Sequence, residues 1–122
     1  MGHINNKYYL GFEGEPEIIF TVVQKNNEKS EISIWSGYFN NIMQQITPVE
    51  GKWTALAYYY NLNIGWYDES PWLVDNIEDA YKQFKSIDKY KLDDLEEEIL
   101  EEILELFKKS IEENNNVYIS YE

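Results

Sequence analysis

The chain of 122 residues contains no cysteine and no arginine, and its only histidine is His3. Without cysteine there are no disulfides, no thiolate nucleophile and no cysteine-ligated zinc or iron–sulfur site. Without arginine there is no guanidinium fork to bind phosphate groups. Most of the usual catalytic residues are therefore missing, so composition alone does not name a reaction, and we expect no cofactor and no metal.

Long apolar runs are also absent. The longest run, from Ile18 to Val23, is far shorter than a membrane span. The start of the chain also lacks the basic segment and apolar segment of a secretory signal. We therefore expect a cytoplasmic protein with no membrane partner. We also expect residues 1–5 to be disordered or to be left over from a recombinant expression tag.

Acidic and aromatic residues are abundant. The 4 Trp, 11 Tyr and 5 Phe supply enough apolar surface for one core, and the length suits a single globular domain over residues 1–122. The 23 acids outnumber the 10 lysines, which gives a net charge of −13. Residues 66–122 hold 17 of the acids. Because this charge repels the nucleic-acid backbone, we expect a basic protein partner and no nucleic acid.

Strand-forming segments follow one another through residues 7–35. We predict a strand at Lys7–Phe12, a hairpin partner at Glu17–Gln24 and a third strand at Glu31–Trp35, in which Ile32 and Ile34 share one face. Polar and glycine-containing turns separate them. The sequence thus predicts an antiparallel meander, to which the alternating segment Val117–Tyr121 returns as a further strand.

Helical patterns dominate the rest of the chain. We predict an irregular connection over Ser36–Val49 that continues a strand through Tyr38–Phe39, and a short buried helix over Trp53–Asn61. Asp75 with Glu78 predicts the start of a helix that runs to Ile87. Asp93 or Asp94 begins a long helix to Glu113, with a core stripe made of Leu95, Ile99, Ile103, Leu106, Phe107 and Ile111. The expected fold is α+β, an antiparallel sheet with two or three helices packed on one face.

The long helix carries a surface of glutamates, which are Glu96, Glu97, Glu98, Glu101, Glu102 and Glu105. Glu97, Glu101 and Glu105 are spaced four residues apart and form a ridge of like charge, hereafter the glutamate ridge. Each such pair destabilises an isolated helix by roughly 0.2–0.5 kcal/mol. The ridge therefore suggests a docking surface, and a merely solvated helix face is the alternative.

A second candidate is the turn around Asp68 and Glu69, in which Trp66, Tyr67 and Trp72 flank the two acids. Gly65 and Pro71 favour a defined loop here. Aromatic rings beside carboxylates are typical of binding hot spots for cationic partners. The alternative is that Trp66 and Trp72 are core residues that fix the loop.

Catalytic or metal-binding carboxylates are a weaker hypothesis. Asp68, Glu69, Asp75 and Asp79 offer pairs for acid–base chemistry, but close pairs arise by chance in a chain this acidic. The segment from Asp68 to Asp79 lacks the alternating ligands and central glycine of an EF-hand loop. Neither pattern marks a site.

Residues 51–88 combine four features, which are Gly51-Lys52-Trp53, the run Ala55–Tyr60, Gly65–Asp68 with Trp72, and the amphipathic helix after Asp75. Together these features give the segment a resemblance to small immunity proteins of bacterial contact-dependent growth inhibition and related polymorphic toxin systems. It implies a non-enzymatic cytoplasmic protein that binds one cognate toxin domain tightly, commonly a nuclease with a basic cleft. No catalytic residue carries over from it.

These observations converge on an immunity protein that neutralises a basic toxin domain. Two alternatives remain open. One is an acidic nucleic-acid mimic that inhibits a DNA-binding protein, whose charges should follow phosphate spacing along a whole face. The other is a small hydrolase, which a pocket with converging carboxylates would favour.

Overall fold

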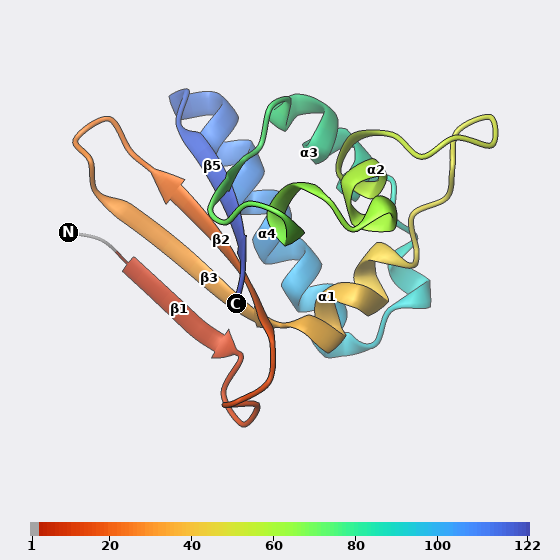
Figure 1. The fold of residues 1–122 in the computed structure, drawn as a ribbon, viewed down its shortest axis with the longest axis horizontal. Helices are drawn as coiled ribbons and strands as arrows, with labels where there is room; N and C mark the ends of the chain where they lie inside the picture. Colours follow the sequence, from red (N-terminus) through yellow and green to blue (C-terminus); the bar gives the residue numbers. More distant parts are fainter. Residues whose placement is uncertain (1–2) are drawn as a thin grey trace.

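The structure is a computed structural model that describes residues 3–122. In this part of the chain, a five-stranded sheet carries four α-helices on one face (Figure 1). In chain order the elements are β1 His3–Tyr8, β2 Glu17–Val23, β3 Lys29–Trp35, α1 Ser36–Met43, α2 Ala55–Leu62, the 3₁₀ turn η1 Gly65–Tyr67, β4 Trp72–Leu73, α3 Ile77–Lys85, the 3₁₀ turn η2 Lys89–Lys91, α4 Asp94–Glu113 and β5 Asn116–Tyr121. The predicted α+β class is confirmed. None of the described helices is both long and apolar enough to cross a membrane.

The centre of the sheet is antiparallel, as predicted. β2 pairs with β3 along its whole length, from Glu17 opposite Trp35 to Val23 opposite Lys29. On its other side β2 pairs with β5, and the short strand β4 adds to the outer edge of β5. The sheet order is therefore β1-β3-β2-β5-β4. Ile32 and Ile34 lie in the core as predicted.

The predicted hairpin between the first two strands is wrong. β1 pairs with β3 in parallel, so the sheet is mixed and β3 lies between β1 and β2. The strand also begins at His3 rather than Lys7, so residues 3–5 belong to the sheet; residues 1 and 2 lie outside the described part. Residues 9–15 instead form successive turns that place the Phe12 ring flat on Trp35, at 4.1 Å between centroids. This packing draws the loop across the end of β3.

The connection predicted to be irregular after residue 35 begins with helix α1. Phe39, Ile42 and Met43 are buried at helical spacing, which is the pattern that could have indicated the helix. Gly37 argued against a helix at the sequence level, because glycine has a low helix propensity. Here the glycine is needed for space, since a Cβ atom at position 37 would lie 2.3 Å from the Trp35 ring.

The two long helices begin with side-chain caps. Asp93 caps α4 and forms a reciprocal capping box with Glu96, as the sequence predicted for this helix start. In α3 the prediction is off by one residue, because Asn76 is the cap and its side chain accepts a hydrogen bond from the Asp79 N–H. Sheet pairing reaches one residue past β4, where the Val74 N–H bonds to the Val117 carbonyl, and this delays the helix start. The helix ends at Lys85, two residues short of Ile87.

A chain of aromatic rings links the helices to the sheet. Phe20 on β2 contacts Phe39 on α1 and Phe107 on α4, and Phe107 contacts Phe84 on α3. The α4 stripe is buried at Ile99, Ile103 and Phe107, while Leu106 and Ile111 are half-buried. The assignment of Leu95 to this stripe is wrong, because Leu95 is 36% exposed. Leu100, which was not assigned to the stripe, is buried.

The buried stripe predicts a measurable difference between two positions of α4. Ile103→Ala should lower the free energy of unfolding by about 2–5 kcal/mol, because it leaves a cavity in a fully buried position. Leu95→Ala is the matched control and should cost less than about 1 kcal/mol, because Leu95 remains partly in water. Urea unfolding measures both. Equal losses for the two variants would contradict the assigned core.

Candidate functional site

Trp66 in the predicted turn is a core residue rather than a surface anchor. It is 1% exposed and its ring lies 6.0 Å from Phe39 and 5.5 Å from Trp72. The core interpretation therefore describes Trp66. Trp72 is half-buried, and one of its sides faces Tyr59 at 4.6 Å between ring centroids.

The turn itself is held firmly by backbone hydrogen bonds and one serine. The N–H groups of Asp68 and Glu69 both bond to the Gly65 carbonyl. The Ser70 hydroxyl donates to the Trp66 carbonyl at 2.7 Å and accepts from the Tyr121 N–H at 3.0 Å. The turn is thereby fastened to the end of β5. Asp68 and Glu69 are exposed on it.

Gly65 fixes the contact between the turn and α2. Its backbone has a φ of +71°, and a Cβ atom there would lie 3.2 Å from Tyr59. The Ile64 N–H also bonds to the Tyr59 carbonyl. The half-buried Tyr67 packs edge-on against Tyr121 on β5, and burial raises the pKa of its hydroxyl. The Tyr67 side chain is therefore uncharged near neutral pH and packs between the turn and β5.

A second group of acids, which the sequence did not indicate, lies at the end of the sheet next to this turn. Glu17 and Glu122 exchange backbone hydrogen bonds where β2 meets β5. Glu15 accepts a hydrogen bond from the Trp35 indole at the same end of the sheet. Glu17 and Glu122 are far apart in the sequence, so only the pairing of β2 with β5 reveals that they lie together next to Tyr121.

The glutamates of α4 have different surroundings. Glu101 forms an ion pair with Lys89, Glu97 is half-buried, and Glu105 is exposed beside a shallow groove that Glu102 also lines. Glu96 is 7% exposed, because its carboxylate accepts hydrogen bonds from the Asn41 amide and from the Asp93 N–H. Glu96 is thus a structural residue, whereas the ridge itself faces solvent.

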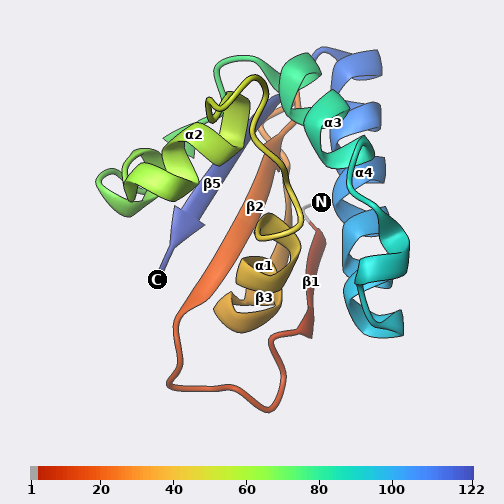
Figure 2. The ribbon, with the colours of Figure 1, turned by 90° about the vertical axis from the view of Figure 1, so that its right-hand side faces the viewer.

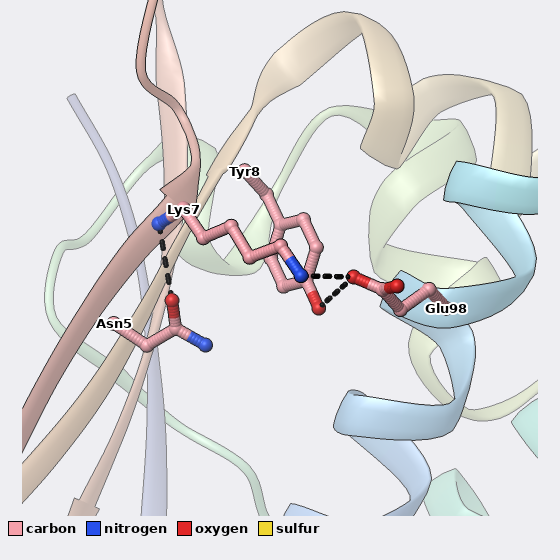
Figure 3. A network of polar contacts seen from close by, with 4 residues as sticks. All are labelled: Asn5, Lys7, Tyr8 and Glu98. Carbon is pink, nitrogen blue, oxygen red and sulfur yellow. Dashed lines mark hydrogen bonds and ion pairs between the residues drawn. The ribbon is translucent and has the colours of Figure 1, made fainter.

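Glu98 ties the edge strand to α4, as Figure 3 shows. One carboxylate oxygen accepts hydrogen bonds from the Lys7 ammonium at 2.7 Å and from the Tyr8 hydroxyl at 2.9 Å. The Lys7 contact lowers the pKa of Glu98, and the Tyr8 contact adds to this effect. Burial, followed by the bond to Glu98, raises the pKa of Tyr8. This network holds β1 in place and gives the parallel pairing a side-chain anchor.

The acidic turn and the glutamate ridge lie on different sides of the molecule. In Figure 2, which looks onto the helices, α2 and the turn lie at the left, α4 lies at the right, and α1 lies between them in front of the sheet. The eight predicted binding residues therefore do not form one surface. Tyr67, Asp68, Glu69 and Trp72 belong to one side, and Glu97, Glu101 and Glu105 to the other.

On the turn side, Trp72 lines a cavity of about 310 Å³ between α2 and the β4–α3 connection. Its other aromatic walls are Trp53, which is 37% exposed, Tyr58, which is 43% exposed, and Tyr59. Asp75 and Asp79 also line it. Sequence reasoning assigned none of these partners to Trp72, because they come from two segments that meet only when α2 packs on α3.

Carboxylates do gather at this cavity, but in a pattern unlike a metal centre. Of the four acids considered for catalysis, Asp75 and Asp79 line the cavity, whereas Asp68 and Glu69 lie on the turn. Within residues 3–122, no three histidine, aspartate or glutamate side chains come together as metal ligands. The cavity therefore offers aromatic surface and negative charge.

The acidic end of the sheet predicts a pH-dependent effect of Glu17. Burial raises the pKa of this carboxyl, and the charges of Glu122 and Glu31 raise it further. A pKa that is higher in the folded state means that the ionised group destabilises the fold near pH 7, and that this effect vanishes below the pKa of the unfolded chain. Glu17→Gln should therefore raise the free energy of unfolding near pH 7 and leave it unchanged at about pH 3.

Urea unfolding at the two pH values measures this effect. Glu112→Gln, which removes an equal charge from an exposed position on α4, is the control for net charge alone. A stability gain of equal size in both variants near pH 7 would show that the local surroundings of Glu17 have no special effect.

Comparison with protein-family models, with curated proteins and with solved structures found no match to this chain. The functional assignment therefore depends on the residues and the geometry described above.

Proposed function

We propose that this protein is a cytoplasmic immunity protein, which binds a cognate toxin domain with a basic surface, in the simplest case a nuclease, and blocks it. The observation that carries the proposal is the composition of segment 53–81. It contains three of the four Trp, five acids and no lysine. In the structure it forms α2, the acidic turn, β4 and the start of α3; α2 and the turn lie on one side of the fold, and α3 lies next to α4 (Figure 2).

The chemistry of this side suits a basic protein partner. Asp68 and Glu69 are exposed on a loop fixed by Ser70, and Trp53 and Tyr58 present partly exposed rings nearby in the chain. Fixed aromatic rings contribute rigid apolar area to an interface, while carboxylates pair with cationic groups of the partner. A net charge of −13 also accelerates encounter with a basic protein before that protein reaches nucleic acid.

The nucleic-acid mimic is supported less well by the arrangement of acids. A mimic needs carboxylates along one continuous face at phosphate spacing. Here the acids are divided among the turn side, the end of the sheet where β2 meets β5, and α4, and Lys7 and Lys89 pair with Glu98 and Glu101 of α4. This division favours recognition of a compact basic patch.

One observation supports the alternative hypothesis of a small hydrolase, because Asp75 and Asp79 line the same cavity. Both residues are exposed to water, however. Carboxylate catalysis needs at least one carboxyl group in a desolvated position, where it stays protonated as an acid. Exposed carboxylates beside aromatic rings favour binding of a cation over hydrolysis.

A protection assay tests the proposal. The partner to express is the variable C-terminal domain of a large secreted protein encoded directly upstream of this chain. Induction of that domain in a bacterial host should stop growth, and co-expression of this protein should restore it. The absence of such an upstream gene, or of any protection, would contradict the proposal.

Two charge-reversal variants locate the binding surface in the same assay. Asp68→Lys with Glu69→Lys should abolish protection and increase the dissociation rate at least tenfold, because a lost contact with a desolvated cation costs about 2–5 kcal/mol. Reversal of the glutamate ridge to lysine is the control. It changes more charge and breaks the Glu101–Lys89 pair, but exposed pairs contribute only about 0–1 kcal/mol. Faster dissociation of the ridge variant than of the turn variant would place the interface on α4.

A further inference from the structure

The cavity between α2 and the β4–α3 connection has aromatic walls, and no side chain of the described residues fills it. Trp53, Tyr58, Tyr59 and Trp72 line it, and its volume of about 310 Å³ exceeds that of a single side chain. Two of these rings are more than a third exposed. Large aromatic rings are usually buried or engaged, so a partly exposed set around a cavity indicates a binding surface.

The walls of this cavity are held in place before any partner binds. Tyr59 packs against Trp72, and Tyr58 packs edge-on against Tyr59 at 5.3 Å. The Gln83 side chain on α3 accepts a hydrogen bond from the Ala57 N–H and donates one to the Thr54 carbonyl, so it joins α3 to the start of α2. A preformed site loses little conformational entropy on binding, which increases its affinity for a small group.

Charge defines what the cavity can accept. Asp75 and Asp79 line it, and the Asn76 side chain holds the Asp79 carboxylate through a hydrogen bond of 2.9 Å. Across residues 3–122, the lysines that form ion pairs are Lys7, Lys89 and Lys109, none of which lines this cavity. The two aspartates are therefore not neutralised by a lysine within the described chain, and the cavity repels anions.

A cavity with aromatic walls and carboxylates is suited to a cationic side chain. A cation is attracted to the faces of Trp and Tyr rings, and a carboxylate supplies the opposite charge. A guanidinium group uses both best, because it is planar, stacks on rings and forms two parallel hydrogen bonds with a carboxylate. An ammonium group is more strongly hydrated and lacks the flat shape.

We propose that this cavity binds the guanidinium group of an arginine side chain that a partner protein inserts between α2 and the start of α3. The source of the arginine depends on the proposed function, in which a basic toxin domain approaches the turn side. The cavity would then be the anchor of the interface, and Asp68 and Glu69 on the turn would contact the same partner. The chemistry itself can be tested without the toxin.

The test is a nuclear magnetic resonance titration that follows the indole N–H signals of the four Trp residues. The probe is the blocked tripeptide acetyl-Gly-Arg-Gly-amide. It should shift the signals of Trp53 and Trp72 in a saturable manner, with a dissociation constant on the order of millimolar, as expected for one small contact. The signal of Trp35, which is at the end of β3 and does not line the cavity, should not move and reports that the fold is intact.

Peptides of matched size separate charge and shape. Replacement of arginine by citrulline, its neutral isostere, should abolish the shifts, and lysine should bind several-fold more weakly. Equal shifts with the citrulline peptide would overturn the role of charge. Lysine binding as tight as arginine binding would overturn the assignment to guanidinium.

Variants of the protein assign the binding to this cavity. Asp75→Asn with Asp79→Asn should weaken arginine binding about tenfold, since both carboxylates are removed with little change in shape. Trp53→Leu tests an aromatic wall at a position that tolerates change because it is partly exposed. Glu102→Gln with Glu112→Gln, which removes two charges from exposed positions on α4, is the matched control and should bind the peptide as the parent does.

Unchanged affinity in the Asp75/Asp79 variant, or shifts of all four indoles, would overturn the proposal. Such a result would leave toxin protection intact if the proposed function is correct and the interface lies elsewhere. Conversely, peptide binding without protection would retain the arginine site and reject the immunity function. The two ideas therefore fail in different experiments.

Discussion

The packing of Phe20 between Phe39 and Phe107 is the contact on which the rest of the structure depends. It joins the central strand to α1 and α4, and Phe107 in turn contacts Phe84 on α3. Trp66 continues this ring cluster towards the turn through Phe39 and Trp72. Because these rings fill one face of the sheet, the helices cover only that face, and the acids of α3 and α4, apart from the buried Glu96, are directed outward.

This one-sided core separates the negative charge into two surfaces with different roles. Charges more than a Debye length of about 8 Å apart are largely screened at physiological salt. The glutamate ridge is on α4, across the fold from α2 and the turn (Figure 2). It therefore influences the encounter with a partner, especially at low ionic strength, while the turn side supplies the desolvated contacts that hold a complex together.

Local sequence patterns predicted the elements whose stability is local. α4 followed from its apolar spacing and the capping box of Asp93 with Glu96. β1 was misassigned because its partner is set by non-local contacts, among them the bond from Tyr8 to Glu98. The turn was predicted, but the cavity was not, since Trp72 lines it together with Trp53 and Tyr58 only because α2 packs beside α3, where the Gln83 side chain bonds to the Ala57 N–H.

Hydrogen–deuterium exchange on the protein alone and in complex with its cognate toxin domain tests the central claim that the turn side is the binding surface. The account predicts slower exchange in residues 53–61 and 65–79 on binding, with residues 97–105 of α4 unchanged. Protection confined to α4 and β1, with residues 53–79 exchanging as in the free protein, would contradict it.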